Sequence, residues 1–152
     1  DSQRIRRALE VQISSGQTLS QWQKHKAGGI AGKVELHPLL LLPPRDWLHA
    51  RCDARFEAML DRGAIDEVVE LLDLNLPEDA PVMRAIGVPE IRAMLNGELS
   101  REEALARGQA ATRQYAKRQY TWFRNQSPDS WPRYAEVYSD SEFSKIERLF
   151  HF

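Results

Sequence analysis

Hydrophobic positions recur at helical spacing over most of the chain. Ile5, Leu9 and Ile13 repeat every four residues, which is the spacing of one face of a helix, and we expect these side chains to face a core. The same criterion predicts helical segments over residues 2–13, around Trp22, and over residues 45–60, 65–72, 82–95 and 101–124. The pattern therefore indicates a mainly helical protein.

Local signals mark where several of these helices begin and end. Ser100 followed by Glu103 is a capping box, in which each side chain accepts a hydrogen bond from the other residue's backbone N–H. Gly16 is expected to end the first helix. Gly87 and Pro89 interrupt residues 82–95, which predicts one broken or two short helices there.

One segment is predicted to be a buried strand. Residues 34–42 end in an unbroken apolar run, which is typical of a strand in a parallel sheet. Because a lone strand cannot pair its own backbone groups, we expect its neighbours to come from sequence outside this chain or from another chain. Val137 and Tyr138 are candidates for a second short strand, and residues 141–152 for a last short helix. The fold class that follows is mainly α with one or two short strands.

The composition is that of a globular protein. Of the 152 residues, 42% are hydrophobic and 28% are charged, which excludes a disordered chain. No stretch approaches the roughly 18 consecutive apolar residues of a membrane-spanning helix, and a single cysteine excludes an internal disulfide. With no secretory leader in the sequence, we expect a cytoplasmic protein without a membrane partner.

The net charge of −1 conceals a segregation of charges along the chain. Acidic residues dominate residues 61–80, whereas no acid occurs between Glu103 and Asp129, a stretch that holds several arginines and a lysine. Such segregation favours a basic face that is presented to a polyanion. On charge alone, solvated helix faces are the alternative.

The strongest chemical signal is the basic and aromatic segment over residues 112–124, TRQYAKRQYTWFR. On a helix, Arg113, Lys117 and Tyr120 share one stripe. Cations neutralise phosphates and flat rings stack on unpaired bases, so this segment favours RNA binding. The alternative is a core-facing aromatic stripe with solvated cations. Two further segments, QRIRRALE over residues 3–10 and RAIGVPE over residues 84–90, indicate structural roles when each is taken alone.

Together and in this order, these segments resemble the tRNA dimethylallyltransferases, also called isopentenyl transferases. The resemblance rests on Q-R-[IL]-x-R-A-L-E, R-x-x-x-R-F-x-x-M-L, R-x-I-G-x-x-E and T-R-x-x-A-K-R-Q-x-T-W, which fall within residues 1–124. Residues 128–152 match no motif of the family. The family often has Gly-Tyr followed by Lys or Arg where this chain has Gly87, Val88 and Pro89, so the contacts of that tyrosine are lost here.

The resemblance implies that the chain is the carboxy-terminal part of a P-loop α/β transferase. The family moves a dimethylallyl group from dimethylallyl diphosphate to the exocyclic amine of the adenosine 3′ of the anticodon. We expect the P-loop, its Mg²⁺ and a general-base aspartate in an amino-terminal half outside this chain, which has no G-x-x-x-x-G-K-[ST] loop and opens within a predicted helix. Residues 1–27 would be the returning part of a helical tRNA-binding insertion, and residues 28–152 the carboxy-terminal part of the catalytic core.

The resemblance also implies the residues of the site. Arg55 matches an arginine that contacts the diphosphate, which suits a guanidinium that binds two phosphate oxygens at once. Arg51 lies one turn earlier and is the next candidate, while an ion pair of Arg55 with Glu57 or Asp61 is the alternative. The positions expected to bind the tRNA anticodon stem-loop, from the family and from the basic stripe, are Gln3, Arg4, Ile5, Arg6, Arg7, Arg84, Ala85, Ile86, Gly87, Val88, Pro89, Arg113, Lys117, Arg118, Gln119, Tyr120, Thr121, Trp122, Phe123 and Arg124.

No catalytic residue and no metal site are expected within this chain. His49 and Cys52 stand three residues apart, but two ligands do not make a zinc site. The chain alone is expected to be inactive and able to self-associate, and the parent enzyme to be a monomer. Two alternatives stay open, namely a stand-alone helical RNA-binding module and an adaptor that binds a basic partner through residues 61–80.

Overall fold

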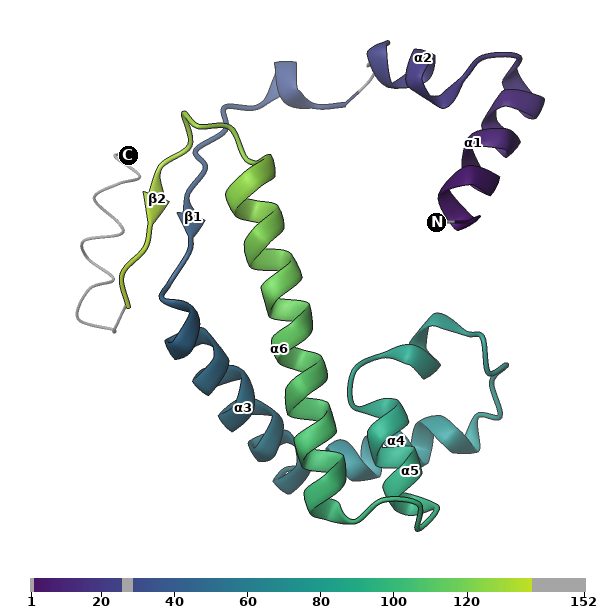
Figure 1. Cartoon of the computed structure of the whole chain (residues 1–152), viewed down its shortest axis with the longest axis vertical. Helices are drawn as coiled ribbons and strands as arrows, with labels where there is room; N and C mark the ends of the chain where they lie inside the picture. Colours follow the sequence, from purple (N-terminus) through teal and green to yellow (C-terminus); the bar gives the residue numbers. More distant parts are fainter. Residues whose placement is uncertain (1, 26–28, 138–152) are drawn as a thin grey trace. The chain divides into compact units, whose positions relative to one another are not determined.

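The computed structural model describes residues 2–25 and 29–137. The chain divides into two compact units, residues 1–37 and residues 38–152. The sequence placed this joint earlier, at Gly28, and the role of residues 1–27 as part of a tRNA-binding insertion stays a prediction. The described part is mainly helical, as predicted (Figure 1).

The first unit is built from short helices. They are α1 (Ser2–Ser15), α2 (Leu19–Lys24) and the 3-10 turn η1 (Ala31–Lys33). Thr18 begins α2 with a capping box, because its hydroxyl accepts the N–H of Gln21 at 3.2 Å while the Gln21 side chain accepts the N–H of Thr18 at 2.7 Å. The Trp22 indole then donates to the Ser15 hydroxyl at 2.8 Å, which ties α2 to the end of α1.

Within the described part of the first unit, nothing covers the apolar stripe of α1. Ile5 and Leu9 are 63% and 55% exposed, and no residue of α1 is buried. The first unit by itself therefore provides no core for these side chains, and the expectation that they face one is not met there. The helical spacing was predicted correctly, but one amphipathic helix buries its stripe only where a second apolar surface meets it.

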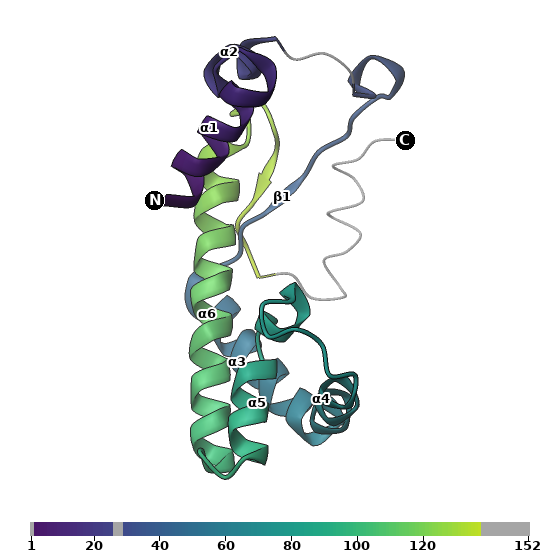
Figure 2. The same cartoon turned by 90° about the vertical axis from the view of Figure 1, so that its right-hand side faces the viewer.

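The second unit contains the longer helices. They are α3 (Arg45–Asp61), α4 (Ala64–Asp73), the 3-10 turn η2 (Pro81–Arg84), α5 (Val88–Leu95) and α6 (Arg101–Gln126). The segment interrupted by Gly87 forms two short pieces, one of the two predicted outcomes. Helix α5 packs alongside the first half of α6 (Figure 2), and α6 begins with the predicted capping box of Ser100 and Glu103.

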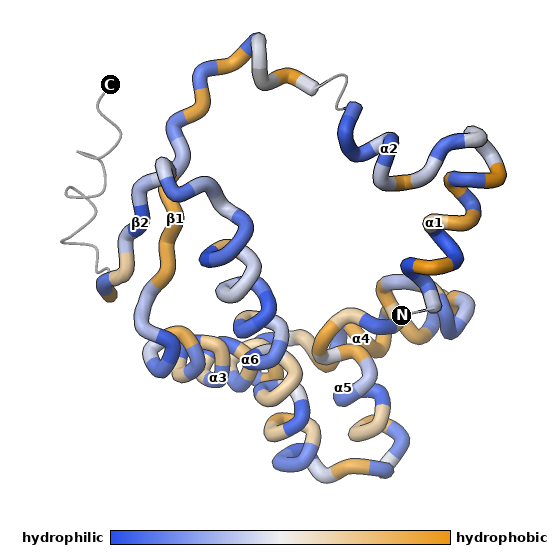
Figure 3. The backbone as a smooth tube through the Cα atoms, turned by 45° about the horizontal axis from the view of Figure 1, so that its top comes forward, coloured by the Kyte–Doolittle hydropathy of each residue, from blue (hydrophilic) through white to orange (hydrophobic). Residues whose placement is uncertain are grey.

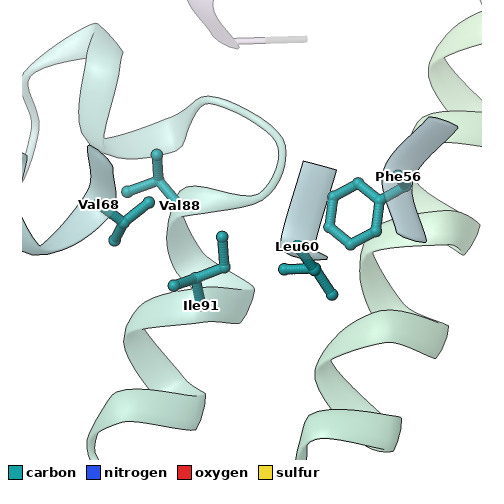
Figure 4. Packing of buried hydrophobic residues seen from close by; sticks show 5 residues of the cluster. All are labelled: Phe56, Leu60, Val68, Val88 and Ile91. Carbon is teal, nitrogen blue, oxygen red and sulfur yellow. The ribbon is translucent and has the colours of Figure 1, made fainter. Parts of the chain in front are cut away.

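The core of the second unit lies where α3, α4 and α5 meet. Five buried side chains form this cluster (Figure 4), namely Phe56, Leu60, Val68, Val88 and Ile91. Burial of an apolar side chain of this size contributes roughly 1.5–3 kcal/mol. Val88 was expected to contact tRNA, but its side chain is only 8% exposed. The Val88 side chain therefore belongs to the core.

Small residues form the seam between α6 and α3. The residues that α6 buries recur every four positions, and they are Ala104, Gly108, Thr112 and Ala116. On a helix this spacing places them in one row. The row leaves room for the Phe56 ring of α3, which occupies the space where a Cβ on Gly108 would stand. Most residues of the long helix are hydrophilic (Figure 3), and it packs through this narrow row.

The predicted strand is shorter than expected and finds its neighbour within the chain. Strand β1 (Leu40–Leu41) pairs in parallel with β2 (Arg133–Tyr134). The Leu40 N–H donates to Pro132 O at 2.9 Å and the Leu42 N–H to Tyr134 O at 2.8 Å. The parallel pairing was predicted, but the expectation that every partner lies outside the chain is wrong.

The rest of the predicted strand region has no strand structure. Val34 and Leu36 are 48% and 65% exposed, and residues 34–37 contain no strand. Backbone groups pair only where a neighbour runs alongside, and in the described part that neighbour reaches residues 40–42 alone. The second strand lies at Arg133–Tyr134. Of the two residues predicted for it, Val137 is not in a strand and Tyr138 lies outside the described residues. The helix predicted over residues 141–152 lies outside the described residues.

Candidate functional site

Two clefts lie along the α3–α6 seam and share part of their walls. The first, here called the apolar cleft, has a volume of about 690 Å³ and is lined mainly by apolar side chains such as Leu42, Trp47 and Phe123. The second, here called the arginine cleft, has a volume of about 520 Å³. Arg55, Thr112 and Tyr115 line both, so a ligand in one cleft lies beside a ligand in the other.

The arginine cleft brings together three arginine residues from three elements. Arg55 comes from α3, Arg84 from η2 and Arg118 from α6. The side chains that line this cleft include no acid. Three arginines that line one cavity without an acid are suited to a ligand with more than one negative charge. Two of them were expected to bind tRNA and one the diphosphate, and the fold places all three at one cleft.

Each of the three arginines is held differently. Arg84 donates through Nη2 to Asp79 O at 2.5 Å, which holds the Arg84 side chain against the loop before η2. The guanidinium of Arg118 lies 5.6 Å from the centre of the Tyr115 ring one turn earlier on α6, a cation–π contact. Arg55 has no ion pair with any of the described residues, and the alternative partner Asp61 binds Arg101 instead. Its charge is therefore available to a ligand.

The turn that precedes α5 explains the segment RAIGVPE in structural terms. Gly87 has φ 104°, a backbone conformation that side chains with a Cβ rarely adopt. The Gly87 N–H donates to a carboxylate oxygen of Glu90 at 2.9 Å, which caps the first turn of α5. Ala85 and Ile86 line the arginine cleft beside Arg84, while Gly87 is buried and Pro89 is exposed. The turn positions this wall of the cleft.

The basic stripe of α6 is divided between internal and exposed positions. Arg113 binds Asp53 of α3, with Nη1 and Oδ1 2.5 Å apart and both side chains about two-thirds buried. The Tyr120 hydroxyl lies 3.4 Å from Leu42 O, and the Arg45 guanidinium lies 5.0 Å from its ring centre. Lys117 and Arg118 are exposed. Among the cations of this stripe, Arg113 is therefore the one that already forms an ion pair within the protein.

The end of α6 carries the remaining residues expected to bind tRNA. Trp122 and Phe123 are exposed and meet edge to face, with ring centres 5.1 Å apart. Gln119 and Phe123 line the apolar cleft, and Thr121 is half-buried. Arg124 is exposed, with Nε 3.4 Å from the side-chain oxygen of Asn125. These side chains form an exposed aromatic and cationic end of the helix.

Arg51 lies at the apolar cleft rather than at the arginine cleft. Its guanidinium lies 5.0 Å from the Trp47 ring centre, and Arg55 lines the same cleft one turn later. The Cys52 side chain is a free thiol that also lines it. The structure therefore separates the two arginines expected to bind diphosphate, because only Arg55 reaches both clefts.

The first unit carries its expected tRNA-binding residues on an exposed helix. Gln3, Arg4 and Ile5 are exposed on α1. Arg6 and Arg7 both approach Glu10, with shortest N–O distances of 3.9 and 3.6 Å. Exposed pairs of this kind contribute little to stability, so they leave these cations accessible.

Two further features concern metals and membranes. The described residues hold no group of three or more His, Cys, Asp or Glu side chains placed to bind a metal ion. Among the helices in the described ranges, none has both the length and the apolar character to cross a membrane.

Three residues that shape this site were not predicted from the sequence, namely Gly108, Asp53 and Gln109. Gly108 admits the Phe56 ring, and Asp53 receives both the Arg113 guanidinium and, through its backbone oxygen, the Gln109 amide at 3.2 Å. One signal was visible in the sequence, because a glycine within a long predicted helix weakens the helix unless packing requires it. The pairing of Asp53 with Arg113 had no such signal.

Comparisons with known proteins agree with the motifs. The model of a family described as IPP transferase matches residues 1–126. The chain is 63% identical to a tRNA dimethylallyltransferase of Sphingopyxis alaskensis, over 91% of this chain and 45% of the relative. It is 61% identical to a tRNA dimethylallyltransferase of Novosphingobium aromaticivorans, over 98% of this chain and 53% of the relative. The chain thus spans about half the length of these curated relatives.

Two solved structures share this architecture. The full-length tRNA isopentenylpyrophosphate transferase of Bacillus halodurans has a TM-score of 0.63 and 32% identity, over 74% of this chain and 37% of that one. The tRNA delta(2)-isopentenylpyrophosphate transferase of Staphylococcus epidermidis has a TM-score of 0.60 and 28% identity, over 97% of this chain and 49% of that one. The family match, the relatives and the fold agree, and the chain belongs to the IPP transferase family.

Proposed function

We propose that this chain is the carboxy-terminal portion of a tRNA dimethylallyltransferase and that its arginine cleft binds phosphate groups of the substrates. The gathering of Arg55, Arg84 and Arg118 in one cleft without an acid carries the proposal. Relatives of about twice this length are tRNA dimethylallyltransferases, which supports the reaction for the whole protein.

On the RNA side, Lys117, Arg118 and Arg84 supply charge to the phosphate backbone. The exposed rings of Trp122 and Phe123 provide surfaces on which unpaired bases stack. We assign RNA contacts also to the exposed residues of α1, Gln3 to Arg7. The anticodon loop suits this site because its adenosine is already unpaired, which lowers the cost of extruding the base.

On the diphosphate side, Arg55 is the residue of this chain that we assign to the leaving group. In the proposed reaction, the adenosine amine nitrogen forms a bond to the allylic carbon as the carbon–oxygen bond to diphosphate breaks. Diphosphate leaves with the electron pair, and a base outside this chain takes the amine proton. A guanidinium near the leaving oxygens stabilises the charge that develops on them. Arg55 fits this role because its guanidinium has no ion-pair partner among the described residues.

Magnesium does not fit the described residues. Divalent magnesium binds through carboxylates, water and phosphate oxygens, and the described part offers no cluster of such side chains. No step is therefore assigned to magnesium within this chain. Its ligands, like the P-loop, belong to the proposed amino-terminal half.

The RNA assignment is tested by the salt dependence of binding. The affinity of the 152-residue chain for an anticodon stem-loop is measured by fluorescence anisotropy over a range of salt concentrations. Lys117→Ala and Arg118→Ala should each weaken binding and flatten the slope of log affinity against log salt by about 0.7–0.9, the change for one lost phosphate contact. Arg107→Gln removes an exposed charge of α6 outside the site and should leave the slope unchanged.

The catalytic part of the proposal has its own test. Mass spectrometry of tRNA incubated with dimethylallyl diphosphate should show the added group with the full-length protein and none with the 152-residue chain. Prenylated tRNA from the chain alone contradicts the assignment of the P-loop to another half. Slopes that stay unchanged in Lys117→Ala and Arg118→Ala, combined with loss of binding to a basic protein after charge reversal in residues 61–80, favour the adaptor instead.

A further inference from the structure

One interaction beside the site ties α3 to α6 at a single residue. Asp53 of α3 binds Arg113 through its carboxylate, with Oδ1 and Nη1 2.5 Å apart. Its backbone oxygen accepts the Gln109 amide at 3.2 Å. Gln109 and Arg113 are one turn apart on α6, so both can bind the same residue of α3. This group of three residues is called the clamp below.

The ion pair of the clamp is more sheltered than an exposed ion pair such as that of Arg7 and Glu10. The side chains of Arg113 and Asp53 are 35% and 33% exposed, against 71% and 55% for Arg7 and Glu10. Ion pairs with reduced exposure are screened less by salt and water. The partly buried ion pair and the hydrogen bond of the clamp therefore oppose a rotation of α3 about its axis.

The clamp and the arginine cleft lie on opposite sides of the seam. Successive residues of a helix are rotated by about 100°, so Asp53 and Arg55 point about 200° apart on α3. Phe56 lies between them in angle and occupies the seam against Gly108. On α6, Arg113 likewise lies on one side of Thr112, and Tyr115 and Arg118 lie on the other. A rotation of α3 about its axis would change the position of Arg55 relative to Arg118.

We propose that Asp53, held by Arg113 and Gln109, is a positioning residue that sets the direction of Arg55 in the arginine cleft. In this proposal Arg113 does not contact RNA. Its guanidinium binds the Asp53 carboxylate and affects the site through that residue. The proposal deepens the proposed function, since it concerns how Arg55 reaches a phosphate ligand. Geometry of this kind matters because charge-assisted bonds from guanidinium to phosphate depend on orientation.

The direction in which Asp53→Asn changes the affinity for the ligand distinguishes a positioning role of the clamp from direct contact between Arg113 and the ligand. If Arg113 bound the ligand directly, Asp53→Asn would release its guanidinium and strengthen binding. If the clamp positions Arg55, Asp53→Asn weakens binding, as Arg113→Gln does. The double variant should then bind no more weakly than either single variant, because both remove the same interaction.

The experiment uses inorganic pyrophosphate and the 152-residue chain. Pyrophosphate affinity is measured by calorimetry, and the Arg55 Nε–Hε signal is followed by nuclear magnetic resonance. We expect Asp53→Asn and Arg113→Gln each to weaken affinity between about twofold and thirtyfold, the usual range for residues that act through others. Asp53→Glu, which keeps the carboxylate, should restore most of it. Arg107→Gln, a control on the same helix, should have no effect.

Folding is checked by circular dichroism, and Gln109→Ala is the second variant should Asp53→Asn unfold the chain. Stronger binding by Asp53→Asn, or no change in either single variant, overturns the proposal. If the wild-type chain does not bind pyrophosphate, the diphosphate assignment of Arg55 fails by itself. The positioning claim is then decided by the Arg55 signal, which must shift in Asp53→Asn and stay in place in Arg107→Gln; an unchanged signal in Asp53→Asn refutes it.

Discussion

The aromatic ring of Phe56 occupies the space in which a side chain on Gly108 would stand. A Cβ built on Gly108 meets three ring carbons of Phe56 closer than real Cβ atoms approach other atoms. Phe56 is 3% exposed and belongs to the core cluster. A residue without a side chain within α6 is therefore what lets α3 approach closely enough for the two helices to share both clefts.

Gly108→Ala should destabilise the chain although alanine is the better helix former. The change gains about 1 kcal/mol in helix propensity, but overpacking a filled core costs about 1–3 kcal/mol. Because the overlap is with a buried ring rather than a flexible tip, we expect a net loss of about 1–2 kcal/mol. Urea unfolding of the 152-residue chain measures it.

The control for this prediction is the ring itself. Phe56→Leu removes the overlapping atoms, so Gly108→Ala should cost less in the Phe56→Leu background than alone. An equal cost in both backgrounds, or a stabilised Gly108→Ala single variant, would show that the ring does not set the requirement for glycine.

Gly87→Ala and Gly63→Ala should destabilise by similar amounts. Both glycines have positive φ, 104° and 114°, which costs an alanine about 1–2 kcal/mol. A Cβ on Gly87 would meet Phe56 at 3.5 Å, an ordinary contact, and one on Gly63 would meet open space. Thermal unfolding compares the two, and a much larger loss at Gly87 would contradict this account.

The Tyr115 ring should matter for RNA affinity and its hydroxyl should not. Tyr115→Phe keeps the ring beneath Arg118, whereas Tyr115→Leu removes the cation–π contact, which is worth about 0.5–1 kcal/mol at an exposed site. We expect Tyr115→Leu to weaken stem-loop binding about twofold to fivefold, the equivalent of that energy. Equal losses in both variants would point to the hydroxyl instead.

Arg55→Ala in the full-length protein should impair the use of dimethylallyl diphosphate and leave tRNA affinity nearly unchanged. Loss of one preorganised group facing a developing charge typically lowers kcat by about 10²–10³-fold. Steady-state kinetics with each substrate varied separately distinguishes the two effects. A fall in tRNA affinity with unchanged diphosphate kinetics would make Arg55 an RNA contact.

Ser100→Ala should destabilise α6 at its first turn. The Ser100 hydroxyl accepts the Glu103 N–H at 3.1 Å and the Glu103 carboxylate accepts the Ser100 N–H at 2.8 Å. Loss of such a cap costs about 1 kcal/mol. The melting temperature should fall by several degrees, while Ser130→Ala, an exposed serine beyond the helix, should leave it unchanged.

Much of the local structure was determined by the sequence alone. The helices begin and end close to the predicted residues, and the Ser100 capping box forms as expected. The family was also recognisable from the order of its motifs, and the comparisons confirm it. These features depend on residues within a few positions of one another, where helical spacing and capping act directly.

The tertiary structure decided which side chains meet. Arg113 looked equivalent to Lys117 along the helix, yet it pairs with Asp53, 60 residues away. Val88 entered the core, and β1 found its neighbour at Arg133. Such outcomes depend on how the helices pack and on which backbone groups come within hydrogen-bonding distance. Packing couples distant residues through their shapes and volumes, and the periodicity of a single segment carries no information on these.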